Sequence, residues 1–270
     1  MLKKLLSVPY VVWMAVFICA PMALVVVYAF SSAGGGFTMR NFQDSANYAN
    51  VFLRSLSLAA IATVICLVIG YPVAYALSRE GERLQSVVMM LIMLPMWMNF
   101  LLRTYAWMSL LENNGLINNF LGLFGLGPFR MINTQGAVVL GMVYNYLPFM
   151  ILPIYSVIVK IDPSVVDASR DLGANSYRVF TRVTFPLSLP GVLSGVTMTF
   201  VPSVSTFAIS KLLGGGKELL LGDLIEMQFL GSAYNPQLGS AISLVMMVLI
   251  LILMSLMNKF GGGSEDAVLL

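Results

Sequence analysis

The stretch SLSLAAIATVICLVIGYPVAYALS, residues 55–78, contains no Asp, Glu, Lys, Arg or His. An α-helix needs about 20 mostly apolar residues to cross the hydrocarbon core of a bilayer. A charge at the centre of such a helix costs roughly 2.5–3.5 kcal/mol on insertion scales. Long intervals between charged residues therefore locate membrane spans, and this interval predicts one.

Other charge-free intervals of sufficient length flank it on both sides. The interval 113–129 is shorter and rich in Asn and Gly, so it predicts a loop or at most a short interfacial helix. No internal repeat or second domain is visible, and we expect one all-α transmembrane domain over 1–270. The six predicted spans are 9–30, 55–78, 84–108, 135–159, 186–210 and 237–257.

The composition supports a helical membrane protein. Apolar residues make up 59% of the chain and charged residues 10%, with a mean hydropathy of +0.88. Soluble domains carry about 25% charged residues. The formal net charge of +3 gives no reason to expect a nucleic-acid partner.

The first predicted span resembles a signal peptide because Lys3 and Lys4 precede it. Its apolar core of about 22 residues exceeds the 7–15 residues of a cleavable signal, so we expect an uncleaved span rather than a removed leader. Six spans place both termini on one side. That side holds nine Lys and Arg residues against six on the other. Cytoplasmic loops are enriched in these residues, which predicts cytoplasmic termini.

Several catalytic chemistries are excluded. Without histidine there is no His-ligated zinc and no Ser–His or Cys–His pair. Cys19 and Cys66 lie in apolar stretches and are expected to act as small hydrophobic side chains. Gly214–Lys217 does not fit a phosphate loop, because Glu218 follows the lysine, and a hinge is expected there instead. We therefore expect no catalytic residue, metal site or cofactor in this chain.

The most informative segment is the predicted cytoplasmic loop 160–185. Asp162 followed by Pro163 is typical of a helix start, and Gly173 is typical of a helix end. A helix is predicted between them, and a second one from Ser176 to Val183. A solvated, positively charged loop would not require capped helices. A docking element for a cytoplasmic partner explains them better.

The same loop resembles the E-A-A-x3-G-x9-I-x-L-P motif of permease subunits of bacterial ATP-binding-cassette (ABC) importers. Here Asp167-Ala168-Ser169 is followed after three residues by Gly173, and after nine more by Val183-Thr184-Phe185-Pro186. The spacing matches throughout, and the substitutions conserve size or charge. The resemblance implies a type I importer fold (the MetI/PotB-like fold) with a cytoplasmic coupling helix. The residues it assigns to ATPase coupling are Asp167, Ala168, Ser169, Arg170, Asp171, Gly173 and Pro186.

A wider resemblance covers about residues 5–258. The segments 70–79, 94–111, 141–158 and 211–230 are similar to spermidine/putrescine permeases of the PotB type. The resemblance implies a polyamine importer whose partners are a second permease (PotC type, forming a heterodimer), two copies of a cytoplasmic ATPase (PotA type) and an external polyamine-binding protein (PotD type). ATP and Mg would be bound by the ATPase.

A polyamine path needs carboxylates, carbonyls or aromatic faces, which attract cations by about 0.5–2 kcal/mol each. None of the charge-free intervals contains Asp or Glu. An unbroken third span would place Trp97, Leu101 and Tyr105 on one helix face. An interfacial aromatic belt or a packing core is the alternative role for the aromatic residues. The candidate path residues are Trp97, Asn99, Tyr105, Tyr144, Asn145, Ser203 and Ser205.

Charged residues near the outer face have other expected roles. Arg103 would repel a polycation, so we expect it to pair with lipid phosphate, stack on Trp107 or contact the external protein. Glu112, Asp223 and Glu226 would either attract cations at an external entrance or be solvated. An amphipathic helix is predicted near the last two, from Leu219 to Leu230. Prolines recur within the spans and act either as static kinks or as hinges.

The sequence thus predicts a multi-pass permease of a bacterial cytoplasmic membrane. An importer for another small solute is the alternative within this class. An ATP-independent secondary transporter is the alternative from another class, but it would need ionisable residues within the membrane to couple ions.

Overall fold

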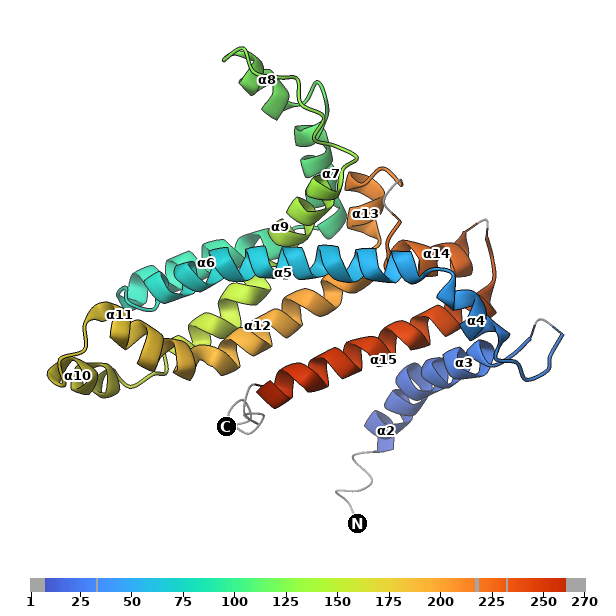
Figure 1. The fold of residues 1–270 in the computed structure, drawn as a ribbon, viewed down its shortest axis with the longest axis horizontal. Helices are drawn as coiled ribbons and strands as arrows, with labels where there is room; N and C mark the ends of the chain where they lie inside the picture. The colour runs from blue at the N-terminus through green and yellow to red at the C-terminus, as the bar shows by residue number, and fades with distance from the viewer. Residues whose placement is uncertain (1–7, 33, 217–218, 232, 261–270) are drawn as a thin grey trace.

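The computed structural model describes residues 8–32, 34–216, 219–231 and 233–260, which form a bundle of helices (Figure 1). Three helices pack along one another at its centre: α5 (Ala49–Leu77), α9 (Gln135–Ile158) and α12 (Phe185–Ser205). Lys3, Lys4, Lys217 and the tail after Phe260 lie outside the described residues.

Small residues explain the close contact of α9 with α12. Gly191 and Gly195 are four residues apart on one face of α12, a spacing that lets helix backbones approach closely in membranes. A Cβ atom at Gly191 would lie 2.8 Å from the carbonyl oxygen of Pro153 on α9. Cys66, Met150, Ile154 and Val192 continue this core toward α5.

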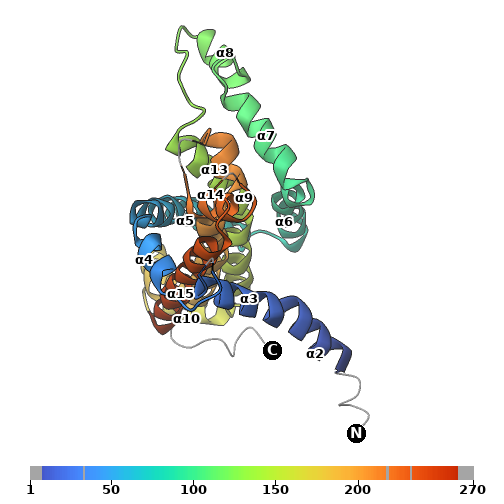
Figure 2. The ribbon, with the colours of Figure 1, turned by 90° about the vertical axis from the view of Figure 1, so that its right-hand side faces the viewer.

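The first span packs on the last one. This span is one long helix, formed by α2 (Val8–Met14), the π-turn η1 (Ala15–Cys19) and α3 (Ala20–Ala29). It packs against α15 (Pro236–Phe260) through α3 (Figure 2). Nearly all of its described side chains are exposed.

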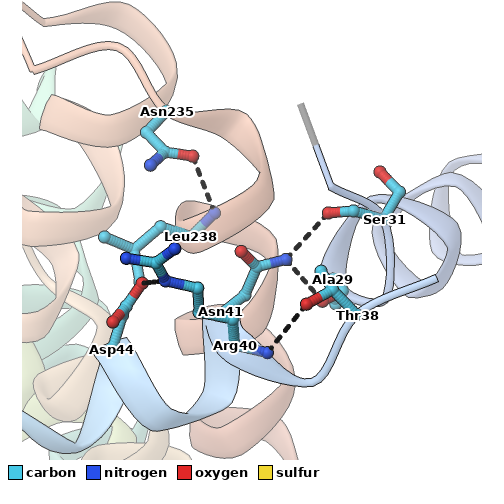
Figure 3. Close-up of polar contacts among 8 residues, drawn as sticks. All are labelled: Ala29, Ser31, Thr38, Arg40, Asn41, Asp44, Asn235 and Leu238. Atoms are coloured by element: carbon cyan, nitrogen blue, oxygen red, sulfur yellow. Dashed lines mark hydrogen bonds and ion pairs between the residues drawn. The ribbon is translucent and has the colours of Figure 1, made fainter. Parts of the chain in front are cut away.

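The helix α4 (Arg40–Ala46) fixes this corner (Figure 3). The Nδ2 atom of Asn41 donates hydrogen bonds to the carbonyl oxygens of Ala29 and Ser31, both at 2.9 Å. Carbonyl groups at a helix end lack partners within the helix, and this side chain supplies one from a separate element.

Two π-turns each lie directly before a proline. η1 precedes Pro21, and η2 (Phe180–Thr184) precedes Pro186. A proline within a helix lacks an N–H and clashes with the carbonyl four residues earlier. These two helices have a wide turn upstream of the proline, whereas α5 and α9 continue through Pro72, Pro148 and Pro153 without one.

The third span differs from the prediction. The expected continuous segment 84–108 is wrong, because the chain breaks after α6 (Glu82–Trp97) and bends by 90° into α7 (Phe100–Leu111) and α8 (Leu116–Gly122). The Oδ1 atom of Asn99 accepts from the Leu101 amide at 2.8 Å and starts the new helix. An Asn cap downstream of Pro95 therefore explains the break.

The fifth span also differs. Its expected start near residue 186 matches the start of α12, and the predicted short helix 176–183 runs directly into it as one helix from Ser176. This helix ends at Ser205, before the expected residue 210. Thr206 adopts an extended conformation (ψ 139°) and separates α12 from α13 (Ala208–Leu213). The outer helix predicted from Leu219 is confirmed as α14 (Leu221–Leu230).

Within the described residues, five helices have the length and composition needed to cross a membrane, and the bent pair would make a sixth span. The C-terminal ends of α5 and α9 lie beside α10 (Pro163–Asp171), whereas α4, α13 and α14 lie at the opposite end (Figure 1). These two ends carry the two groups of predicted site residues.

Candidate docking and transport sites

The loop helix α10 begins and ends as the sequence predicts. The Oδ1 atom of Asp162 accepts a hydrogen bond from the Ser164 amide at 2.9 Å, and this bond lowers the pKa of the Asp162 carboxyl. At the other end Gly173 has φ +83°, and its amide donates to the carbonyl of Arg170 at 2.8 Å. The Ala174 amide donates to Ser169. This pair of bonds is the Schellman motif, so local residues alone define the helix.

No residue of α10 is buried. Asp167, Ala168 and Asp171 are exposed, and Asp167 meets Arg170 only in an exposed ion pair at 3.4 Å. Such pairs contribute about 0–1 kcal/mol. The helix is held by its caps and presents its charged side chains to the solvent.

Two apolar residues that the sequence analysis missed lie beside this helix. Leu172 is 90% exposed and Tyr177 is 74% exposed. Leu172 follows α10 directly, and Tyr177 is the second residue of α11 (Ser176–Val179). The signal that could have found Leu172 is its place as an apolar residue directly after a short polar helix. Leu172 lies outside the candidate spans, so its exposure marks a position suited to a protein partner.

The loop 160–185 is not packed tightly on the bundle. A cavity of about 340 Å³ separates α10 from the C-terminal ends of α5 and α9. Tyr75, Arg79, Ile158 and Arg170 are among its lining residues. Pro186 lies outside this cavity, exposed in the first turn of α12. The loop therefore has space to shift relative to the spans.

The aromatic residues of the third span do not share one face. Because the helix breaks between Trp97 and Phe100, Trp97 belongs to α6 whereas Leu101 and Tyr105 belong to α7. The predicted alignment of these three residues is therefore wrong. Trp97 (78% exposed) and Tyr105 (47% exposed) are accessible at the corner, and Asn99 caps α7.

The candidate path residues on α9 and α12 are of two kinds. Tyr144 packs edge-on against Trp107 with ring centroids 5.4 Å apart. Asn145 and Ser203 are buried and bond to backbone carbonyls of their own helices, at 2.8 and 2.7 Å. Ser205 is exposed at the outer end of α12. A role for these residues in substrate passage stays a prediction.

Arg103 is buried at 8% exposure, which sequence reasoning did not anticipate. Its guanidinium lies over the ring of Tyr144 at 6.0 Å, and its Nε and Nη1 atoms have no hydrogen-bond partner. Stacking therefore occurs on Tyr144 rather than on the expected Trp107.

The three outer carboxylates differ in environment. Glu112 is exposed, and Glu226 pairs with Lys211 at 3.0 Å. Asp223 is not solvated: it is 7% exposed, and its Oδ2 accepts from the Leu220 amide at 3.0 Å. Burial raises the pKa of Asp223, while the Ser210 hydroxyl and the Leu220 amide oppose the shift. The Asp223 carboxylate points into the protein because it accepts a hydrogen bond at the start of its own helix, α14.

An apolar helical bundle with an exposed, capped helix at one end agrees with the membrane permease subunit that the sequence predicts. Residues 67–261 match the family model described as "binding-protein-dependent transport system inner membrane component". The chain belongs to this family and, within it, to the PotB permease proteins.

Two relatives illustrate the similarity. The spermidine/putrescine transport system permease protein PotB of Haemophilus influenzae is 39% identical over 251 residues, which cover 89% of this chain and 87% of that protein. The PotB protein of Escherichia coli strain K12 is 35% identical over 246 residues, covering 87% of this chain and 89% of that one.

Solved structures share the fold. A bacterial ABC transporter involved in the import of the acidic polysaccharide alginate matches with a TM-score of 0.83 at 15% identity, over 98% of this chain and 96% of that chain. The MetNI methionine ABC transporter matches with a TM-score of 0.58 at 19% identity, over 79% and 94% of the two chains. This chain therefore has the fold of ABC importer permeases.

Proposed function

We propose that this permease carries polyamines, spermidine or putrescine, into a bacterial cell. The named function of its PotB relatives supports this substrate class. The protein would pair with a second permease, bind two copies of an ATPase that carries ATP and Mg, and receive polyamine from an external binding protein. Both termini would be cytoplasmic.

The exposed helix α10 is the observation that carries the coupling role. It is capped at both ends, contributes no side chain to the core and is followed by the exposed residues Leu172 and Tyr177. Because local hydrogen bonds hold α10 together and a cavity lies beside it, α10 can move as a rigid unit. An ATPase docked on α10 would transmit closure of the ATPase pair to the spans.

The spans themselves offer a weak path for a cation. α9 and α15 carry no acidic residue, and Trp97 and Tyr105 are exposed aromatic groups at the bend of the third span. Aromatic faces attract ammonium groups without holding them tightly. The tight binding would then belong to the external protein, and a partner permease would supply any carboxylate.

ATPase activity of the complex reconstituted in lipid tests this function. We expect spermidine or putrescine, with binding protein present, to stimulate hydrolysis more than a control solute does. Gly173→Trp and Leu172→Asp should abolish stimulation by disrupting the docking surface. Gly122→Trp is the matched control, because Gly122 lies in α8 with open space around it.

Each part of the proposal has its own contrary result. Stimulation by a different solute alone would leave an importer but exclude the polyamine assignment. Transport by a preparation that contains no ATPase would favour a secondary transporter. Full stimulation in both docking variants would move the docking site away from α10.

A further inference from the structure

The docking loop enters the fifth span through an intrinsically weak joint. In the π-turn η2, the Phe185 amide donates to the carbonyl of Phe180, five residues earlier. Pro186 follows and has no N–H, so it donates nothing to the preceding turn. Helices bend readily at π-turns and prolines. A push on α10 would therefore bend the chain at η2 unless another element braces this joint.

Tyr71 of α5 braces the joint on both sides. Its ring meets Phe180, at the start of η2, edge-on with centroids 5.7 Å apart and an interplanar angle of 88°. It also meets Phe185, just beyond the π-turn, at 5.7 Å. One side chain from another helix thus contacts both ends of the wide turn.

The Tyr71 hydroxyl extends this brace by one more turn. It lies 2.8 Å from the Oγ atom of Ser188. Ser188 donates its single hydroxyl hydrogen to the carbonyl of Phe185 at 2.9 Å. The Tyr71 hydroxyl must therefore be the donor to Ser188. This chain of two hydrogen bonds links α5 to the backbone of α12 directly beyond η2.

Burial strengthens this link. Ser188 is fully buried and Tyr71 is 7% exposed. Hydrogen bonds are stronger in a low-dielectric interior, where an unpaired partner is also costly. Tyr75, one turn along α5, packs edge-on against Phe180 with centroids 5.2 Å apart. The inner end of α5 is thus attached to the joint by two aromatic side chains.

We propose that Tyr71 is a positioning residue that splints η2 through Phe180, Phe185 and Ser188, so that a displacement of α10 moves α5 and α12 as one body. The inference rests on the proposed docking role of α10. Without the splint, ATP hydrolysis would continue while part of each displacement is lost in bending at η2.

Coupling efficiency in the reconstituted complex tests this role. We expect Tyr71→Phe and Ser188→Ala each to lower solute uptake per ATP hydrolysed by about 3- to 10-fold, the range that one net hydrogen bond corresponds to. The double variant should be no worse than Ser188→Ala alone, because Ser188→Ala already removes the bond to Tyr71 together with the bond to Phe185. Tyr155→Phe is the matched control: it removes a tyrosine hydroxyl bonded to Gln85 at 2.8 Å, away from η2.

A distance measurement makes the test independent of the solute. Spin labels at the exposed residues Ser176 and Leu187 flank the joint. We expect a narrow distance distribution in the wild type and in Tyr155→Phe, and a broad one in Tyr71→Phe. If Tyr71→Phe fails to assemble, Ser188→Ala, the smaller change, carries both measurements.

Two results would overturn the proposed positioning role of Tyr71. One is an unchanged uptake-to-ATP ratio with a narrow distribution in both variants. The other is a proportional loss of uptake and ATPase activity, which would show that Tyr71 only stabilises the fold. The substrate assignment fails separately, on the solute preference of the wild type alone.

Discussion

A Cβ atom at Gly195 of α12 would lie 3.0 Å from the carbonyl oxygen of Met150 on α9. The two backbones are in close contact at this point, and a residue with a Cβ would require α9 and the Met150 side chain to shift. Because α9 and α12 form the centre of the bundle, this contact determines how closely these two helices pack against each other.

Substituting Gly195 should destabilise the bundle. In an open helix Gly→Ala stabilises, because alanine has the higher helix propensity. At Gly195 we expect Gly195→Ala to cost about 1–3 kcal/mol, because the new methyl group must push α9 away. Gly122→Ala, where nothing lies within 4 Å, should be neutral or better. Thermal unfolding of the two variants in detergent checks this; equal midpoints would contradict the packing argument.

Substitution of Gly173 should destabilise the end of α10 because of the backbone conformation alone. Its φ of +83° is unfavourable for residues with a Cβ, and nothing surrounds the Cβ position. Gly173→Ala should therefore cost about 1–2 kcal/mol in the end of α10 and weaken ATPase retention. Gly173→Asn should retain more ATPase, since Asn tolerates this conformation. Co-purification measures the retention; a loss in Gly173→Asn equal to or larger than that in Gly173→Ala would contradict the argument from backbone conformation.

Removing the Asn41 amide should loosen the first span. Asn41→Ala leaves the carbonyls of Ala29 and Ser31 without this donor (Figure 3). We expect a loss of about 1–3 kcal/mol and faster hydrogen exchange in α4 and at the end of α3. Arg40→Ala is the control, because its 3.8 Å pair with Asp44 is exposed and contributes little. Similar exchange in both variants would exclude the bracing role of Asn41.

Asp223 should make stability depend on pH. Burial raises its folded-state pKa above the ordinary 3.8. The protonated form is therefore favoured in the folded state, and stability falls as pH rises from 3.8 through the raised pKa. Asp223→Asn preserves an oxygen to accept from Leu220, and we expect it to remove this fall. Melting midpoints against pH measure it; parallel curves for variant and wild type would contradict the prediction.

Local features of the fold were predictable. The caps of α10 involve residues two to five positions apart, so Asp162 and Gly173 indicated this helix directly. The spans 55–78, 135–159 and 237–257 overlap α5, α9 and α15, because the cost of a buried charge depends on the residue itself. The Gly191–Gly195 spacing was a readable signal of close packing that the sequence analysis did not use.

The bend in the third span was not predicted, although its local causes are visible in hindsight. Hydropathy measures how apolar a segment is and does not respond to an Asn that caps a new helix. Asn99 was therefore assigned to the substrate path and not recognised as a helix cap, within an interval that looked continuous. The same limitation placed Trp97 and Tyr105 on one face.

The sequence by itself determined which segments are apolar enough to span a membrane and where the docking helix starts and stops, because both depend on residues close together in the chain. Only the tertiary structure decided that Arg103 and Asp223 are buried, and that Tyr71 meets Ser188 across 117 positions. Burial and pairing of that kind depend on which helices become neighbours. That choice is made by the packing of whole surfaces, which no local pattern records.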